Sequence, residues 1–264
     1  MKYSVLSKMG SLRERNEDAC AVTRQGILVV ADGVGGSTYG EVASKIAVTT
    51  ISHYLTSHYP KLKRRPQPTM INAVKETNRE IIKQGLMDPR LIGMASTIVA
   101  AFLDGKRAHL VNVGDSRAYL FRPPSMIKRL TKDHSILQEL KEHLKSNQEI
   151  LPAKSLNHII TQWLGSRKIS PYYSSISLRR EDYVLLCTDG LSGTLSDTQI
   201  MNEIMSGSTL EKINQELASA AQEEGGNDDI TIVIARLGYS NRKSKKRLLH
   251  KENPVEPNAR ARAA

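Results

Sequence analysis

The sequence predicts an α+β fold, in which antiparallel strands form a sheet and helices pack on its faces. Three observations predict it. Short apolar runs bounded by Gly or Asp recur along the first 237 residues. Turn residues of the hairpin type join neighbouring runs. Stretches with helical periodicity lie between the runs but do not alternate with them one by one, which excludes a simple βαβ repeat.

Six runs are predicted strands, because each is apolar and is bounded by turn residues. They span 27–31, 96–103, 108–113, 118–121, 183–187 and 230–237. Asp104-Gly105 fits a two-residue hairpin turn, and Gly114-Asp115 separates the third run from the fourth. These short connections favour antiparallel pairing.

Five segments are predicted helices. The first spans 38–57, where Thr38 and Glu41 have the spacing of a capping box. A helix at 196–205 would begin at Ser196 and Asp197, two residues that suit a helix N-terminus. The other three span 69–84, 135–145 and 209–222. Interleaved helices and hairpins are typical of an α+β domain.

The composition predicts one domain at residues 1–238 and a basic, disordered tail at 239–264. Apolar periodicity stops after Leu237, and Lys, Arg, Asn, Pro and Ala follow. The net charge is +11, and residues 240–264 carry +6 of it, from eight basic and two acidic residues. The remaining +5, with two Phe and one Trp for base stacking, disfavours nucleic acid as a partner of the body.

The cysteine content and the hydropathy indicate the cytoplasm. The two cysteines, Cys20 and Cys187, both lie in apolar strand-like runs and are expected to be buried thiols in a reducing compartment. The N-terminus lacks a secretory signal, and no segment approaches the roughly 20 apolar residues that span a bilayer. We therefore expect a cytoplasmic monomer without a membrane partner or an organic cofactor.

Acidic residues recur next to glycine at the ends of the apolar runs. They are Asp32, Asp115, Asp189 and Asp228, with Glu17-Asp18 before another run. Each aspartate alone is more often a turn former. Together, strands that end at one rim would bring these carboxylates close, and a divalent cation would offset their repulsion. Oxygen-only ligands select Mg²⁺, Mn²⁺ or Ca²⁺ rather than Zn²⁺, and the seven scattered histidines show no zinc-site spacing.

The glycine-rich loop at 32–36 is not a nucleotide cradle. It lacks the Gly-Lys-Ser/Thr ending of a P-loop, and Thr38 stands where a GxGxxG pattern needs its last glycine. A kinase or ATPase is thereby disfavoured.

An ordered set of motifs resembles the PP2C-like (PPM) metal-dependent serine/threonine protein phosphatases of the bacterial type, from about Tyr3 to Leu237. The motifs are GSLR, NED, ADGVGGSTYGEVAS, GMASTIVAAF, VGDSRAYLF, LTKDHS, LLCTDGL and GGNDDITIVIA. Each motif is weak by itself, but the set in this order is specific. The resemblance implies a central β-sandwich of two antiparallel sheets flanked by helices, with a metal centre at one end.

The resemblance also implies the residue roles. Asp32 would bridge two Mn²⁺ or Mg²⁺ ions, and Arg13 would bind the substrate phosphate. The carbonyl of Gly33, Asp189 and Asp228 would complete the metal ligands, Glu17 and Asp18 would act through water, and Asp115 would join Asp189 at an additional, weaker site. The implied reaction is hydrolysis of phosphoserine and phosphothreonine by a metal-activated water.

Two departures and one variable segment stand out. Asp229 occupies a position that is usually asparagine in the family, and Ala95-Ser96-Thr97 replaces Gly-Thr-Thr. The segment 131–165 corresponds to a variable flap. It contains Lys132, Lys141, Lys145 and Lys154, and we expect it to influence substrate choice unless it is only a solvated helix face.

The expected partners are phosphoproteins, including a serine/threonine kinase or its targets. The main alternative is a catalytically weak regulatory or phosphoprotein-binding module.

Overall fold

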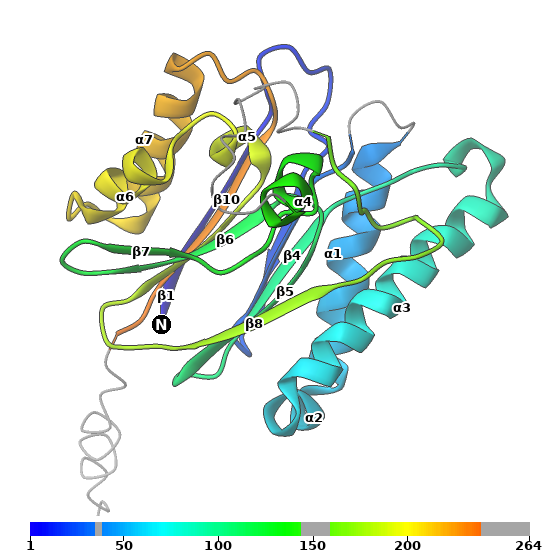
Figure 1. Cartoon of the computed structure of the whole chain (residues 1–264), viewed down its shortest axis with the longest axis horizontal. Helices are drawn as coiled ribbons and strands as arrows, with labels where there is room; N and C mark the ends of the chain where they lie inside the picture. Colours follow the sequence, from blue (N-terminus) through cyan, green and yellow to red (C-terminus); the bar gives the residue numbers. More distant parts are fainter. Residues whose placement is uncertain (35–38, 144–158, 239–264) are drawn as a thin grey trace, which may run out of the picture.

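Two antiparallel sheets stack at the centre of the computed structural model, which describes residues 1–34, 39–143 and 159–238 (Figure 1). Within these residues each sheet has five strands, in the orders β1-β10-β9-β6-β7 and β2-β3-β4-β5-β8. The sandwich confirms the predicted α+β fold and the arrangement that the resemblance implies.

The strands have the following bounds. The first sheet consists of β1 (Lys2–Lys8), β10 (Ile230–Arg236), β9 (Tyr183–Cys187), β6 (Arg117–Arg122) and β7 (Met126–Arg129). The second consists of β2 (Ala19–Val22), β3 (Ile27–Ala31), β4 (Ile98–Leu103), β5 (Arg107–Val113) and β8 (Tyr172–Ser177). The apolar side chains between the sheets include Val30, Leu120 and Val233.

Helices cover both outer faces of the sandwich (Figure 1). The second sheet is covered by α1 (Gly40–Ser57) and α3 (Pro66–Met87), with α2 (Tyr59–Arg64) between them and the short η1 (Pro89–Leu91) after them. The first sheet is covered by α5 (Asp189–Ser192), α6 (Asp197–Met205) and α7 (Leu210–Glu223). The remaining helix, α4 (Ile136–His143), lies with α5 at one end of the sandwich, uppermost in Figure 1.

The six predicted strands are confirmed, and β3 and β9 agree at both ends. The edge strands of the two sheets are β1, β2, β7 and β8. Of these only β2 was indicated by the sequence, as the run with Cys20 that follows Glu17-Asp18, and without bounds. Their residues are largely half-buried or exposed, whereas β3, β4 and β9 are buried throughout. Edge strands therefore lack the continuous apolar run on which the prediction rests.

Helix boundaries follow local capping. Ser196 forms the complete capping box of α6 with Gln199, and Thr209 accepts the backbone N–H of Lys212 at the start of α7, as their positions in the sequence predict. The first helix begins at Gly40, after Tyr39 in the left-handed conformation. Thr38 and residues 144–145, which the predicted helices included, lie outside the described residues. Two short helices, α2 and α5, were not predicted.

Two connections differ in detail from the predicted turns. The hairpin between β4 and β5 is confirmed, but its turn residues are Gly105 and Lys106, because the N–H of Asp104 donates to the carbonyl of Arg107. The expected antiparallel pairing of the runs 108–113 and 118–121 is wrong, because β5 and β6 belong to different sheets and the connection between them crosses from one sheet to the other. Gly114 stands at this crossing with φ +100°, and a Cβ there would lie 2.7 Å from the side chain of Thr97.

Both cysteines are free thiols, Cys187 buried and Cys20 half-buried. Burial raises the pKa of Cys20 to about 11 and that of Cys187 to about 12, which keeps both thiols protonated near neutral pH.

None of the helices in the described part of the chain has the length and apolar character needed to cross a membrane.

Candidate metal centre

The predicted site residues come together at the end of the sandwich where α4 and α5 lie. They reach it from five connections: Arg13, Glu17 and Asp18 from β1–β2, Asp32 from the end of β3, Asp115 from β5–β6, Asp189 from the start of α5, and Asp228 from α7–β10. Their charges act on one another, since Asp18, Asp189, Asp115 and Asp228 all raise the pKa of Asp32. We call the six acidic residues of this set, Glu17, Asp18, Asp32, Asp115, Asp189 and Asp228, the carboxylate cluster.

Asp18 lies deepest among these carboxylates, with a residue exposure of 7%. Its Oδ2 accepts a hydrogen bond of 2.9 Å from the hydroxyl of Thr188, while its Oδ1 is buried without a hydrogen-bond partner in the described residues. Burial raises the pKa of Asp18 well above its ordinary value, partly opposed by the hydroxyls of Thr231 and Thr188. A buried, unpartnered carboxylate oxygen is costly unless a cation or a proton reaches it.

Two hydroxyl side chains fix the backbone of Asp32. Its N–H donates to Oγ1 of Thr97 at 3.0 Å, and its carbonyl accepts from Oγ of Ser96 at 2.8 Å. Thr97 in turn lies 2.7 Å from the hydroxyl of Ser116, beside Asp115. The Ser96-Thr97 pair, noted in the sequence only as a departure from a family pattern, thus positions Asp32 and links it to the segment of Asp115.

Asp32 as a whole residue is half-buried, and the surroundings of its carboxyl raise its pKa well above the ordinary range. Burial of the carboxyl is the main cause, followed by repulsion from Asp18 and Asp189. Asp115 behaves alike, because burial and the charge of Asp189 raise its pKa to about 7. The cluster therefore carries more negative charge than the surrounding protein compensates.

Arg13 is turned toward the cluster. Its Nε and Nη2 donate to one carboxylate oxygen of Asp228, at 2.9 and 2.6 Å, and its Nη1 lies 3.6 Å from Glu17. Burial lowers the pKa of Arg13, but the pairing with Asp228 outweighs this and raises it. Burial also raises the pKa of Glu17, and Arg13 opposes that shift. The sequence did not predict the ion pair between Arg13 and Asp228.

Asp229 holds the loop that carries Arg13 and Glu17. Its Oδ1 accepts the backbone N–H of Gly10 at 2.8 Å, and its Oδ2 accepts that of Glu17 at 2.7 Å. The residue is 3% exposed. A carboxylate can accept both bonds, whereas an asparagine in the same place has one acceptor oxygen and would turn its NH₂ group toward the other N–H. Asp229 therefore faces the protein interior rather than solvent.

Gly10 and Gly33 allow backbones to meet at the cluster. A Cβ on Gly10 would lie 2.2 Å from the carbonyl oxygen of Asn227, and one on Gly33 would lie 2.4 Å from the carbonyl carbon of Gly40. No larger residue fits either position without moving the backbone. Gly33 also donates its N–H to the carbonyl of Glu17 at 3.1 Å, which ties the predicted carbonyl ligand to the loop of Glu17.

The segment 131–135 is tied to the cluster by Arg117 and His134. Arg117 donates to both oxygens of Asp133 and, at 3.1 Å, to the carbonyl of Ser192 in α5. His134 accepts the N–H of Gly114 on Nδ1 and donates its own backbone N–H to the carbonyl of the same glycine. His134 is buried, so the structural role expected of a lone histidine fits it better than that of a ligand.

The donor chemistry of the cluster fits hard divalent cations. Its side chains offer only carboxylate oxygens, which Mg²⁺ and Mn²⁺ accept as ligands, and the unpartnered Oδ1 of Asp18 is a buried acceptor. Among the described residues, no three acidic, histidine or cysteine side chains converge closely enough to form a finished ligand cage.

The comparisons with known proteins agree with one another. A model described as protein phosphatase 2C matches residues 12–232. The chain is 32% identical over 235 residues to the serine/threonine phosphatase stp of Listeria monocytogenes, covering 85% of this chain and 91% of the relative. It has the same identity to the serine/threonine protein phosphatase PstP of Mycobacterium tuberculosis, with 89% of this chain covered but only 45% of the length of PstP.

Among solved structures, the catalytic domain of PstP in complex with two manganese ions aligns with a TM-score of 0.75 and 30% sequence identity. The alignment covers 90% of this chain and 98% of that structure.

Proposed function

The chain belongs to the protein phosphatase 2C family, and on this basis we propose that it hydrolyses phosphoserine and phosphothreonine in proteins with two Mn²⁺ or Mg²⁺ ions. The observation that carries the proposal is the carboxylate cluster. Burial and mutual repulsion raise the pKa of Asp18 and Asp32, and Oδ1 of Asp18 has no partner among the described residues. Cations are the partners that such a set lacks.

The residue roles form part of this proposal. Asp32 would hold both ions, and the solved PstP catalytic domain with two manganese ions supports a binuclear site. The carbonyl of Gly33, Asp189 and Asp228 would be the other ligands, Glu17 and Asp18 would act through water, and Asp115 with Asp189 would form an additional, weaker site.

The ions, when bound, supply the positive charge that activates a water for attack on phosphorus. Arg13 then contributes the guanidinium of the β1–β2 loop that pairs with Asp228, whereas Arg15 of the same loop pairs with Glu41. An opening of about 450 Å³ is lined by Leu12, Arg13, Asn227 and Asp228, so a phosphate there lies beside Arg13. The planar guanidinium can donate two parallel hydrogen bonds to phosphoryl oxygens, and Arg13 would exchange its bonds to Asp228 for these.

Asp229 and the Ser96-Thr97 pair hold the proposed site residues in place. Asp229 keeps Arg13 and Glu17 at the cluster through the two backbone N–H groups that it accepts. Ser96 and Thr97 hold the backbone of Asp32 from both sides. Such positioning limits the rearrangement required when substrate binds.

The expected partners are phosphoproteins, and a serine/threonine kinase or its targets would be the physiological counterpart. We place the protein in the cytoplasm, as a monomer. Its two free cysteines with raised pKa values suit a reducing compartment.

Hydrolysis of a phosphothreonine peptide tests the proposal. Turnover is measured with Mn²⁺, with Mg²⁺ and with EDTA, beside the variant Asp189→Asn, which excludes a contaminating phosphatase. We expect turnover with either metal and none with EDTA. The variant Asp189→Asn should lose most of the turnover. A folded protein without turnover on several phosphopeptides would instead support the alternative, a phosphoprotein-binding module.

A further inference from the structure

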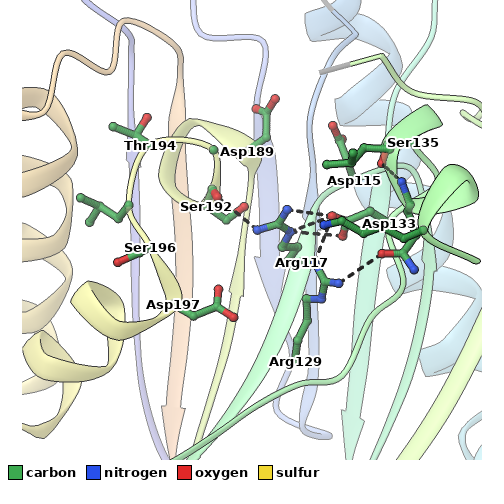
Figure 2. A pocket seen from close by; sticks show the side chains of 15 residues that line it. Asp115, Arg117, Arg129, Asp133, Ser135, Asp189, Ser192, Thr194, Ser196 and Asp197 are labelled. Atoms are coloured by element: carbon green, nitrogen blue, oxygen red, sulfur yellow. Dashed lines mark hydrogen bonds and ion pairs between the residues drawn. The ribbon is translucent and has the colours of Figure 1, made fainter. Parts of the chain in front are cut away.

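A second cavity adjoins the carboxylate cluster at Asp115 and Asp189. It has a volume of about 660 Å³ and includes Asp115 and Asp189 in its lining (Figure 2). Its walls come from β6 and β7, from α4, and from the segment that joins α5 to α6. None of its lining residues is shared with the opening beside Arg13. We call it the flank pocket.

The charge of the flank pocket beyond Asp115 and Asp189 is positive. Its described lining there contains three cations and two anions: Arg117, Arg129, Lys141, Asp133 and Asp197. Figure 2 shows Arg117 and Arg129 converging on Asp133, with Nη2 of Arg117 at 2.7 Å and Nη1 of Arg129 at 3.2 Å from Oδ2. One carboxylate between two guanidinium groups leaves a net positive charge at that wall.

The two arginines differ in what they can still bind. The donor groups of Arg117 are already used, because it donates to both oxygens of Asp133, to the carbonyl of Ser192 and to the hydroxyl of Tyr119. The side chain of Arg129 is 33% exposed, and its bonds to Asp133 and Gln138 are long, at 3.2 and 3.4 Å. Arg129 therefore retains donor capacity toward the pocket.

Lys141 adds a second available cation. It lies on α4 and lines the pocket, and it makes no ion pair or hydrogen bond within the described residues. On the opposite wall Thr194 and Ser196 precede α6, and their hydroxyls already donate to the carbonyl of Gly190 and to the side chain of Gln199. The groups that can bind a carboxylate or a phosphate in this pocket are therefore an arginine and a lysine.

We propose that the flank pocket binds an anionic side chain of the phosphoprotein, either a carboxylate or a second phosphate, close to the residue that is dephosphorylated. This inference rests on the proposed function and adds a substrate class to it. The anion is held by Arg129 and Lys141, while Asp133 and Arg117 fix the position of Arg129. Asp197 restricts the anion to the side of the pocket nearer α4.

The test uses phosphothreonine peptides that differ only in charge. One reference peptide carries Gln around the phosphothreonine, and each of a series replaces one Gln, before or after it, by Glu or by phosphoserine. The measured quantity is the ratio of kcat/KM for each anionic peptide to that of the reference. We expect at least one position to give a ratio of about 10, the effect of one charge-assisted contact.

Charge reversal locates the contact. Arg129→Glu and Lys141→Glu, made separately so that one remains if the other does not fold, should each bring that ratio to 1 or below. Lys75→Glu on α3, an exposed residue outside the pocket, is the matched control and should keep the wild-type ratio. Equal ratios for all peptides with the wild-type protein would overturn the inference, and so would a preference that survives both reversals or falls equally in the control.

Binding separates this inference from the proposed function. Fluorescence anisotropy with the same peptides in EDTA measures the preference without turnover. A protein that prefers the anionic peptides through Arg129 and Lys141 but never hydrolyses them would contradict the proposed function and support the flank pocket. Turnover without any preference would do the reverse.

Discussion

Arg13 donates two hydrogen bonds to a single oxygen of Asp228, from Nε at 2.9 Å and from Nη2 at 2.6 Å. The residue proposed to hold phosphate thus rests on a carboxylate proposed to hold metal. The pairing keeps the guanidinium at the mouth of the opening before substrate arrives. When both ligands bind, Arg13 would contact the phosphate and Asp228 would contact the metal.

Arg13→Ala should reduce kcat/KM for a phosphothreonine peptide by about 10²–10³-fold, the usual effect of losing one donor to developing charge. Arg13→Lys should recover only part of this, because an ammonium group cannot donate in a planar fork. Steady-state kinetics with both variants decides the matter. Arg15→Ala, which removes a neighbouring guanidinium paired with Glu41 instead, is the control. Wild-type kinetics in Arg13→Ala would refute the phosphate-binding role.

Asp229→Asn should lower both the free energy of unfolding and the affinity of the protein for metal. One of the two backbone N–H groups, of Gly10 or Glu17, would lose its acceptor, at a cost of about 1–3 kcal/mol in the free energy of unfolding. The loop with Glu17 would also be less well placed, so calorimetric titration should give a larger Kd for Mn²⁺.

Asp104→Asn supplies the comparison for Asp229. Asp104 accepts two backbone N–H groups, of Lys106 and Arg107, on one carboxylate oxygen and in a hairpin away from the cluster, so its replacement by asparagine can keep both bonds. It should leave the Kd for Mn²⁺ unchanged. If both variants bind Mn²⁺ like the wild type, Asp229 has no part in placing the metal loop.

Asp18→Asn should raise the unfolding temperature of the protein in EDTA. It should also reduce the increase in unfolding temperature that Mn²⁺ causes. The substitution removes one of several repelling charges and a buried carboxylate oxygen without a partner in the described residues, a change of about 0.5–2 kcal/mol in favour of the folded state. Thermal unfolding with and without Mn²⁺ measures both effects. A variant that is less stable than the wild type in EDTA would show that Asp18 is not under electrostatic strain.

His134 should make the protein less stable as the pH falls below about 6.5, the ordinary value for histidine. Burial lowers the pKa of His134, so the folded state binds fewer protons than the unfolded state. The contribution of neutral His134 to the free energy of unfolding is therefore fully present above the pKa of the unfolded state. It is lost as the pH falls through the lower pKa of the folded state. Protonation of Nδ1 would also remove the acceptor of the Gly114 N–H.

Charged neighbours modulate this titration of His134. They are Lys132, which lowers the pKa further, and Asp133, Glu139 and Glu142, which raise it. Urea unfolding between pH 5 and pH 8, compared with His134→Gln, isolates the histidine: the slope of stability against pH should be smaller in the variant. An identical slope would assign the acid sensitivity to other groups.

The sequence predicted the interior strands because those strands are buried on both faces. The runs at 27–31 and 183–187 coincide with β3 and β9, whose residues are all buried. The edge strands β1, β7 and β8 escaped prediction, and β2 was indicated only without bounds, for the opposite reason, since half-exposed residues carry no continuous apolar signal.

For the site, the sequence predicted which residues would meet and which class of cation their oxygens suit, because aspartate beside glycine at strand ends is a local pattern. It could not give the contacts that hold them. Asp229 accepts N–H groups more than 200 positions away in the chain, and Thr97 fixes Asp32 from another strand.

What the sequence by itself determined is therefore the kind of fold, the family and the carboxylate set, all of which depend on local pattern and residue chemistry. What only the tertiary structure decided is the pairing of Arg13 with Asp228, the unpartnered oxygen of Asp18 and the positive wall of the flank pocket. These depend on packing between distant segments, where burial and small differences in distance set the strength of each charge.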